Sequence, residues 1–122
     1  MLRRLLLPLA LVAIALAAVN AAAAKGGGTL KGEVYPDSQF KIEMKNAAGG
    51  KLTTLKAGTY KIKIEDKAAI HDFHLTGPGV NKSTSVGGKS ETTWTVALKP
   101  GTYTYVCDPH ASQMRGTFKV TK

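Results

Sequence analysis

One short segment near the C-terminus carries three side chains that bind soft metal ions. Cys107, His110 and Met114 supply a thiolate, an imidazole and a thioether within eight residues. These soft or borderline ligands favour copper over magnesium, calcium or manganese. Pro109 restricts the backbone of the segment, which favours a preset geometry. The segment therefore predicts a metal site that needs a further ligand from elsewhere in the chain.

A second segment, residues 70–75 with the sequence Ile-His-Asp-Phe-His-Leu, offers that ligand. Alternate side chains of a strand point to the same face. Phe73 and Leu75 are the apolar pair that would face a core, so His71 should point inward with them at the beginning of the strand. His74 should point the other way, close to the site or at the surface. Two imidazoles, a thiolate and a weak axial thioether form the blue-copper arrangement.

Other interpretations of these residues stay open at this point. Cys107 could be a plain buried thiol, since free cysteines are often buried. It could also be a nucleophile with His110 as its base, although the phosphatase pattern needs an arginine where Gln113 stands. Met114 could fill the core, with Gln113 then offering an axial oxygen.

Short alternating segments predict the elements that position these ligands. Apolar and polar residues alternate over residues 40–45, 60–65 and 93–98, and strands are also expected over 101–107 and 116–121. Alternation with period two and frequent turns indicate an antiparallel all-β sandwich or small barrel. The ligand segment 107–114 would then be a hairpin-like loop. Lys25 and Gly26–Gly28 are expected to form a flexible leader, and Met44 and Trp94 to lie in the core.

The N-terminal residues differ from the rest of the chain. Arg3 and Arg4 precede an almost wholly apolar stretch over residues 5–19, and the small residues 21–24 follow. This order is typical of an export signal. We expect a signal peptide over 1–24, cleaved after Ala24, and one domain over 25–122, in the periplasm or outside the cell. The alternative is an uncleaved anchor, because the apolar stretch approaches the roughly 20 residues that span a bilayer.

The charge of the chain indicates which kinds of partner it binds. The formal net charge is +9, and cleavage would remove Arg3 and Arg4, which leaves +7. Lysines spread along the mature chain suit acidic partners. A single arginine remains after the signal, with no basic run, which argues against nucleic-acid binding. A lone cysteine cannot form an internal disulfide. It would oxidise outside the cytoplasm unless it binds a metal, pairs with the thiol of a partner or is buried in the core.

Three stretches resemble the cupredoxins, the family of plastocyanin, amicyanin and pseudoazurin. Residues 71–75 resemble the first ligand strand, 101–107 the strand before the ligand cysteine, and 107–110 followed by Met114 the ligand loop. The resemblance implies a monomeric eight-stranded Greek-key β-sandwich; from the strand pattern we expect about seven or eight strands. Asp72 stands where the family usually has an asparagine that ties the ligand loops together, and Pro109 would support the site beside it.

The resemblance also implies a route for electrons. In the family the edge of the second histidine reaches the surface within an apolar ring, which Pro109, Ala111 and the turn containing Pro78 would supply around His110. All four coordination positions are filled by protein, so we predict a one-electron carrier with redox donor and acceptor proteins as partners, and no enzyme. Copper delivery or storage, and a thiol enzyme using Cys107 and His110, are the alternatives.

Overall fold

The computed structural model describes residues 26–122 of the chain. The predicted signal segment lies outside this range and stays a prediction. Within this range, nine strands and one short 3-10 turn follow one another: β1 (Gly26–Val34), β2 (Ile42–Lys45), β3 (Thr54–Lys56), β4 (Gly58–Asp66), β5 (His74–Gly77), β6 (Val80–Ser83), β7 (Ser90–Leu98), β8 (Gly101–Val106), η1 (Asp108–His110) and β9 (Arg115–Thr121). No helix among the described residues has the length and apolar character needed to cross a membrane.

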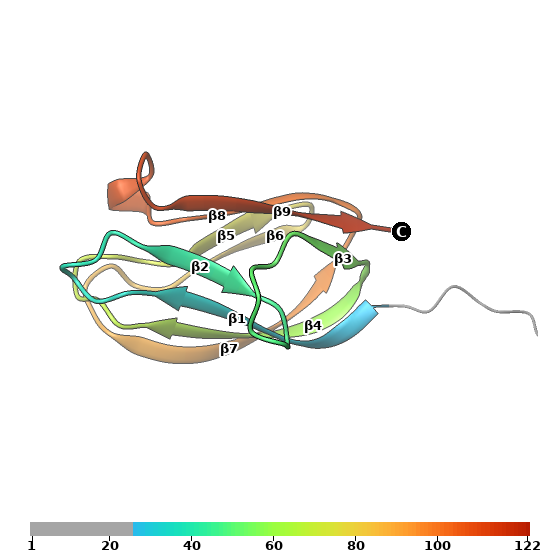
Figure 1. Cartoon of the computed structure of the whole chain (residues 1–122), viewed down its shortest axis with the longest axis horizontal. Coiled ribbons are helices and arrows are strands. Elements are labelled where there is room, and N and C mark those ends of the chain that lie inside the picture. Colours follow the sequence, from blue (N-terminus) through green and yellow to red (C-terminus); the bar gives the residue numbers. More distant parts are fainter. Residues whose placement is uncertain (1–25) are drawn as a thin grey trace, which may run out of the picture.

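The strands form two sheets packed face to face (Figure 1). One sheet has the order β2-β1-β4-β7 and the other β3-β9-β8-β5-β6. The predicted all-β sandwich is confirmed, but it has nine strands, more than expected. It is also mixed, because β1 pairs with β4 and β3 with β9 in parallel. Period-two alternation reports which face a residue occupies and carries no information about strand direction.

The alternating pattern correctly predicts the buried face of β4. Tyr60, Ile62 and Ile64 on β4 are buried between exposed lysines, and Tyr103 and Tyr105 on β8 are buried as well. Met44 lies in the core as expected. Trp94 is only partly buried and packs against the core from β7, at the edge of its sheet.

The predicted flexible leader is wrong for residues 26–28. They form the first part of β1 and pair with residues 58–60 of β4. The two strands approach so closely here that a Cβ at Gly58 would lie 2.0 Å from the carbonyl oxygen of Gly26. Glycine is thus required for strand packing at a position where the sequence pattern indicated a linker.

One end of the sandwich carries the candidate ligands. β8 and β9 are antiparallel, and their last pair, Val106 with Arg115, leaves residues 107–114 as the connecting loop. β5 lies beside β8 with His74 opposite Val106, so the segment before β5 reaches the same end. Figure 1 shows this loop, with η1, at the end opposite the C-terminus.

Candidate metal centre

Three predicted ligands converge at this end of the sandwich. The Nδ1 atoms of His71 and His110 are 3.0 Å apart, and Cys107 Sγ lies 3.7 Å from the first and 3.5 Å from the second. The point equidistant from these three atoms is about 2.0 Å from each, which is the bond length between an imidazole nitrogen and a first-row metal such as zinc. The side chains present therefore fit one metal ion without rearrangement.

The loop that carries Cys107 and His110 is closed by its own backbone. Cys107 N–H donates to the carbonyl of Met114 at 3.0 Å, and His110 N–H donates back to the carbonyl of Cys107 at 3.1 Å. Pro109 occupies the first turn of η1, where a missing N–H costs no hydrogen bond. The predicted hairpin-like loop is confirmed, and hydrogen bonds of its own backbone hold it.

His71 comes from the segment that precedes β5. The strand was expected to begin at this residue, but β5 begins three residues later, at His74. The alternation nevertheless holds, because His71, Phe73 and Leu75 are all buried. Phe73 N–H donates to Thr84 Oγ1 at 2.9 Å, which holds this segment against the start of the next loop. His71 thus reaches the ligand loop from the segment before β5, the strand that lies beside β8 in the same sheet.

Met114 closes the ligand loop from inside the core. Its side chain is fully buried, and its N–H donates to the carbonyl of His110 at 2.9 Å. Gln113, the alternative axial donor, is exposed. The role of Met114 as axial ligand stays a prediction, which its burial and its backbone hydrogen bonds to Cys107 and His110 support.

Asp72 joins the two ligand segments. Its carboxylate is buried and accepts a hydrogen bond of 2.6 Å from the N–H of Asp108, the residue after Cys107. Burial first, and then the nearby Asp108 carboxyl, raise the pKa of Asp72 above its usual range. An aspartate can therefore form the tie that the resemblance assigns to an asparagine.

His74 stands outside the ligand group, as its outward position predicts. Its Nδ1 lies 2.9 Å from the Asp108 carboxylate and its Nε2 lies 2.6 Å from Asn81 Oδ1. A protonated imidazole can donate from both nitrogens, and the hydrogen bond with Asp108 raises the pKa of His74. His74 thus braces the outer side of the ligand loop.

The environment of Cys107 combines burial with local hydrogen-bond donors. Burial raises the pKa of the Cys107 thiol, while the backbone groups of Asp72 and His110 near the sulfur oppose that shift. A bound metal ion deprotonates a coordinating thiol outright. In such a site, hydrogen bonds around the cysteine sulfur tune the reduction potential of a bound copper ion.

Phe40 is a site residue that the sequence pattern did not reveal. Its ring makes edge contacts with the rings of both His71 and His110, at centroid distances of 5.3 and 4.9 Å. The side chain is nevertheless 49% exposed. The alternation over residues 40–45 assigned it to a core-facing strand, whereas β2 begins at Ile42. The signal in the sequence that could have identified Phe40 was a large apolar residue just before a strand.

Pro78 does not belong to the surface around His110. It lies in the turn between β5 and β6, where its carbonyl accepts a hydrogen bond from Tyr103 and its ring adjoins Gly101. Gly101 begins β8 and the ligand loop follows its end, so the length of β8, roughly 20 Å, separates Pro78 from His110. Pro109 and Ala111 are exposed beside His110, and their part in an apolar surround stays a prediction.

Comparison with known proteins identifies the family. The sequence family described as the cupredoxin-like domain matches residues 8–120. The chain belongs to the cupredoxin-like family. Amicyanin-alpha of Methylorubrum extorquens is 35% identical over 108 residues, which cover 80% of this chain and 87% of that protein. The cupredoxin resemblance is confirmed, and family membership together with the grouped histidines and cysteine supports copper as the cofactor.

Solved structures share the fold of this cupredoxin. Rusticyanin from Thiobacillus ferrooxidans aligns with a TM-score of 0.55 at 22% identity, over 80% of this chain and 79% of that one. Dithionite-reduced auracyanin from Roseiflexus castenholzii aligns with a TM-score of 0.51 at 17% identity, over 81% of this chain and 100% of that one. At these identities the likeness establishes the sandwich architecture.

Proposed function

We propose that this protein is an exported carrier of single electrons, with copper held by His71, Cys107, His110 and, axially, Met114. The observation that carries the proposal is the triangle of two Nδ1 atoms and one Sγ around a point that suits a metal ion. Copper bound there would supply one-electron exchange between Cu(I) and Cu(II). The rest of the chain would hold the ligands in place and expose one edge of the His110 ring.

The ligand surroundings favour a carrier over an enzyme. His71, Cys107 and Met114 are buried, which leaves a substrate no approach to the metal from the inside of the sandwich. A nucleophilic cysteine needs exposure and a depressed pKa. Cys107 is buried and burial raises the pKa of its thiol, which argues against the thiol-enzyme alternative.

His110 is the proposed exit for electrons. Of the three grouped ligands, it alone is partly exposed. Phe40 contacts its ring, and Pro109 and Ala111 flank it on the loop. A partner that covers this apolar patch would lie within contact of a ligand ring, which shortens the path for the electron.

Further parts of the proposal follow from the sequence. The signal pattern before Lys25 supports export to the periplasm or the outside of the cell. Membership of the cupredoxin-like family supports a monomer there. The excess of lysines supports donor and acceptor proteins with acidic docking surfaces.

The test is repeated reduction and oxidation of the copper-loaded protein under coulometric control. A carrier takes up and returns one electron per chain through many cycles and retains its copper throughout. Release of the metal on each reduction would instead favour delivery or storage. Met114→Leu should alter the midpoint of the cycle and preserve copper binding, since the axial thioether tunes the site and the other three ligands hold it.

A further inference from the structure

A groove opens between β2 and β9, beside the metal centre. Its volume is about 270 Å³. Tyr105 and Met44, which are both buried, contribute to its lining. Its charged lining consists of four cations, Lys41, Lys45, Lys51 and Arg115, and one carboxylate, Glu43. The groove is therefore a partly apolar hollow with a cationic rim.

The positive charge of this rim is only partly neutralised. Lys41 and Lys45 form salt bridges with Glu43 at 3.1 and 3.2 Å. Lys51 and Arg115 are exposed and form no salt bridge with any residue of the range 26–122. An arginine presents a planar fork of donors that suits a carboxylate. The groove thus offers free donors to an incoming acidic group.

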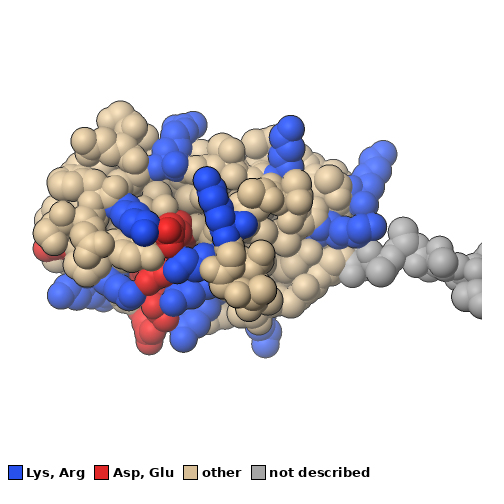
Figure 2. Space-filling model, in the orientation of Figure 1, with Lys and Arg blue, Asp and Glu red and all other residues tan. Residues whose placement is uncertain are grey.

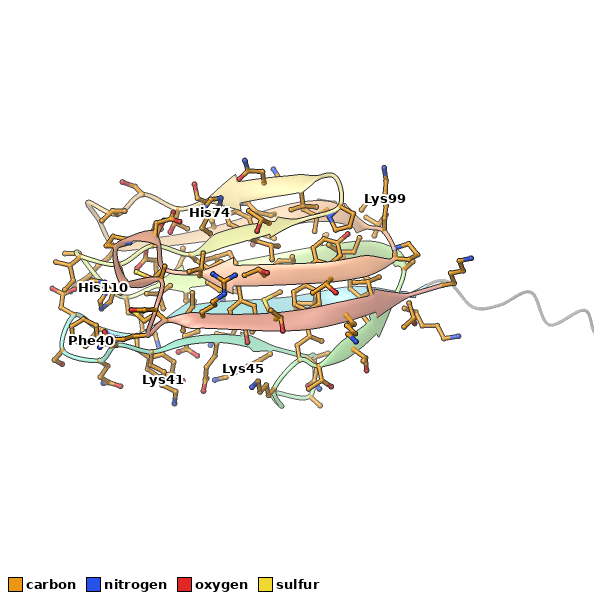
Figure 3. The ribbon with its side chains drawn as sticks, turned by 90° about the horizontal axis from the view of Figure 1, so that it is seen from above. Phe40, Lys41, Lys45, His74, Lys99 and His110 are labelled. Carbon is orange, nitrogen blue, oxygen red and sulfur yellow. The ribbon has the colours of Figure 1, made fainter. Side chains whose placement is uncertain are left out.

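The groove adjoins the proposed electron exit directly. Arg115 follows Met114 in the chain, and Lys41 follows Phe40. Figure 3 shows Phe40 and His110 together at one end, with Lys41 and then Lys45 farther from that end. Figure 2, which views the molecule from the β2 and β9 side, shows basic side chains scattered across this face and acidic ones mainly in one band.

The opposite side of the exit has a different charge. Asp108, with a side chain 51% exposed, lies there and pairs with His74, which Figure 3 places away from β2. An acidic partner is attracted on the β2 and β9 side of His110. On the Asp108 side it is attracted less strongly or is repelled. This polarity can select one rotation of a partner about the exit.

We propose that the groove between β2 and β9 receives carboxylates of an acidic redox protein, while an apolar part of that protein covers Phe40 and His110. The inference rests on the proposed function and adds to it the side from which the partner docks. Charge complementarity mainly raises the rate of association and fixes orientation. The lysines at the far end, such as Lys56 and Lys99, have no part in it.

The test uses the copper-loaded, reduced, ¹⁵N-labelled protein and two anionic probes. A hexaglutamate peptide imitates the partner's acidic surface, and the redox-inert paramagnetic hexacyanochromate ion marks where anions reside. Amide signals of Lys51, Arg115 and Lys45 should shift with the peptide and broaden with the ion. The variant Lys51→Gln with Arg115→Gln should weaken peptide binding roughly fivefold or more, because two free donors are lost. The control Lys56→Gln with Lys99→Gln removes the same charge at the far end and should weaken it less than twofold.

Three results would overturn the docking inference. These are equal losses in the two double variants, broadening spread evenly over the lysines, or tighter binding to vesicles containing phosphatidylserine than to the peptide. The visible spectrum of each sample reports separately on the copper centre. A missing copper signal with intact groove binding would refute the proposed function alone, and an intact copper signal with no groove binding would refute the docking inference alone.

Discussion

Replacing Asp72 with asparagine should raise the reduction potential of the bound copper. Asp72 is 2% exposed, and its carboxylate accepts its 2.6 Å hydrogen bond from Asp108 N–H. An asparagine oxygen can accept the same bond, so the substitution removes a charge and keeps the tie between the ligand segments. Burial and the Asp108 carboxyl raise the pKa of Asp72 to about 6. The carboxylate is therefore ionised at pH 8, where it favours Cu(II).

The size of the shift follows from the position of the carboxylate. Asp108 N is one residue beyond Cys107, so we take a separation of roughly 7 Å, about two residue lengths, between the carboxylate and the centre of the ligand triangle. At an effective dielectric constant of about 20, a unit charge at that distance interacts by about 2 kcal/mol. A one-electron potential changes by 59 mV for about 1.4 kcal/mol. Local rearrangement reduces the effect, so we expect a rise of roughly 50–100 mV.

The assay is a spectroelectrochemical titration of the copper-loaded protein at pH 8. Asp37→Asn is the matched control, because Asp37 also accepts a backbone hydrogen bond, from Ala69, but is exposed. Its potential should stay close to that of the unaltered protein, since solvent screens the charge. An unchanged or lowered potential in Asp72→Asn, with the visible spectrum intact, would refute this electrostatic reasoning.

Three further predictions concern stability in the absence of metal, each read from urea unfolding. Phe40→Ala should lower the free energy of unfolding by about 1–2 kcal/mol, because two aromatic edge contacts are lost; the similarly exposed Val86→Ala should cost less, and equal costs would contradict a special role for Phe40. Gly116→Ala should cost about 1–3 kcal/mol, because a Cβ there would lie 2.2 Å from the Tyr105 hydroxyl oxygen. Gly88→Ala, which meets nothing within 4 Å, should be nearly neutral, and a neutral Gly116→Ala would show that Tyr105 moves freely. Hydrogen bonds from Lys67 and Lys45 outweigh burial and lower the pKa of Glu33 from 4.5 to about 2. Glu33 therefore stabilises the fold above pH 4.5, and up to about 3 kcal/mol is lost as the pH falls toward 2. The same pH dependence in Glu33→Gln would assign that loss to other groups.

Much of the site was predictable because it depends on local patterns. Strand alternation placed His71 with Phe73 on an inward face, and both are buried. The donor types at residues 107–114 indicated the metal, and the loop between two strands kept those donors together. These are properties of consecutive residues, which a sequence displays directly.

The parts that were not predictable depend on contacts between distant segments. Phe40 reaches His110 across seventy positions of the chain, and nothing near Phe40 indicates that partner. The parallel pairing of Gly26–Gly28 with β4 likewise needs knowledge of how closely two strands approach. Pro78 was wrongly expected near His110 for the same reason. A turn next to a ligand strand can lie at either end of that strand, and the contact with Tyr103 shows which end it is.

The central claim is that Cys107 holds copper together with two histidines. The most direct measurement is the visible absorption spectrum of the purified protein after addition of Cu(II), for the unaltered chain and for Cys107→Ala. We predict an intense band toward the red end that a mild reductant bleaches and that Cys107→Ala lacks, because the band arises from thiolate-to-copper charge transfer. A colourless unaltered protein whose thiol titrates freely, or a band that survives in Cys107→Ala, would contradict the account.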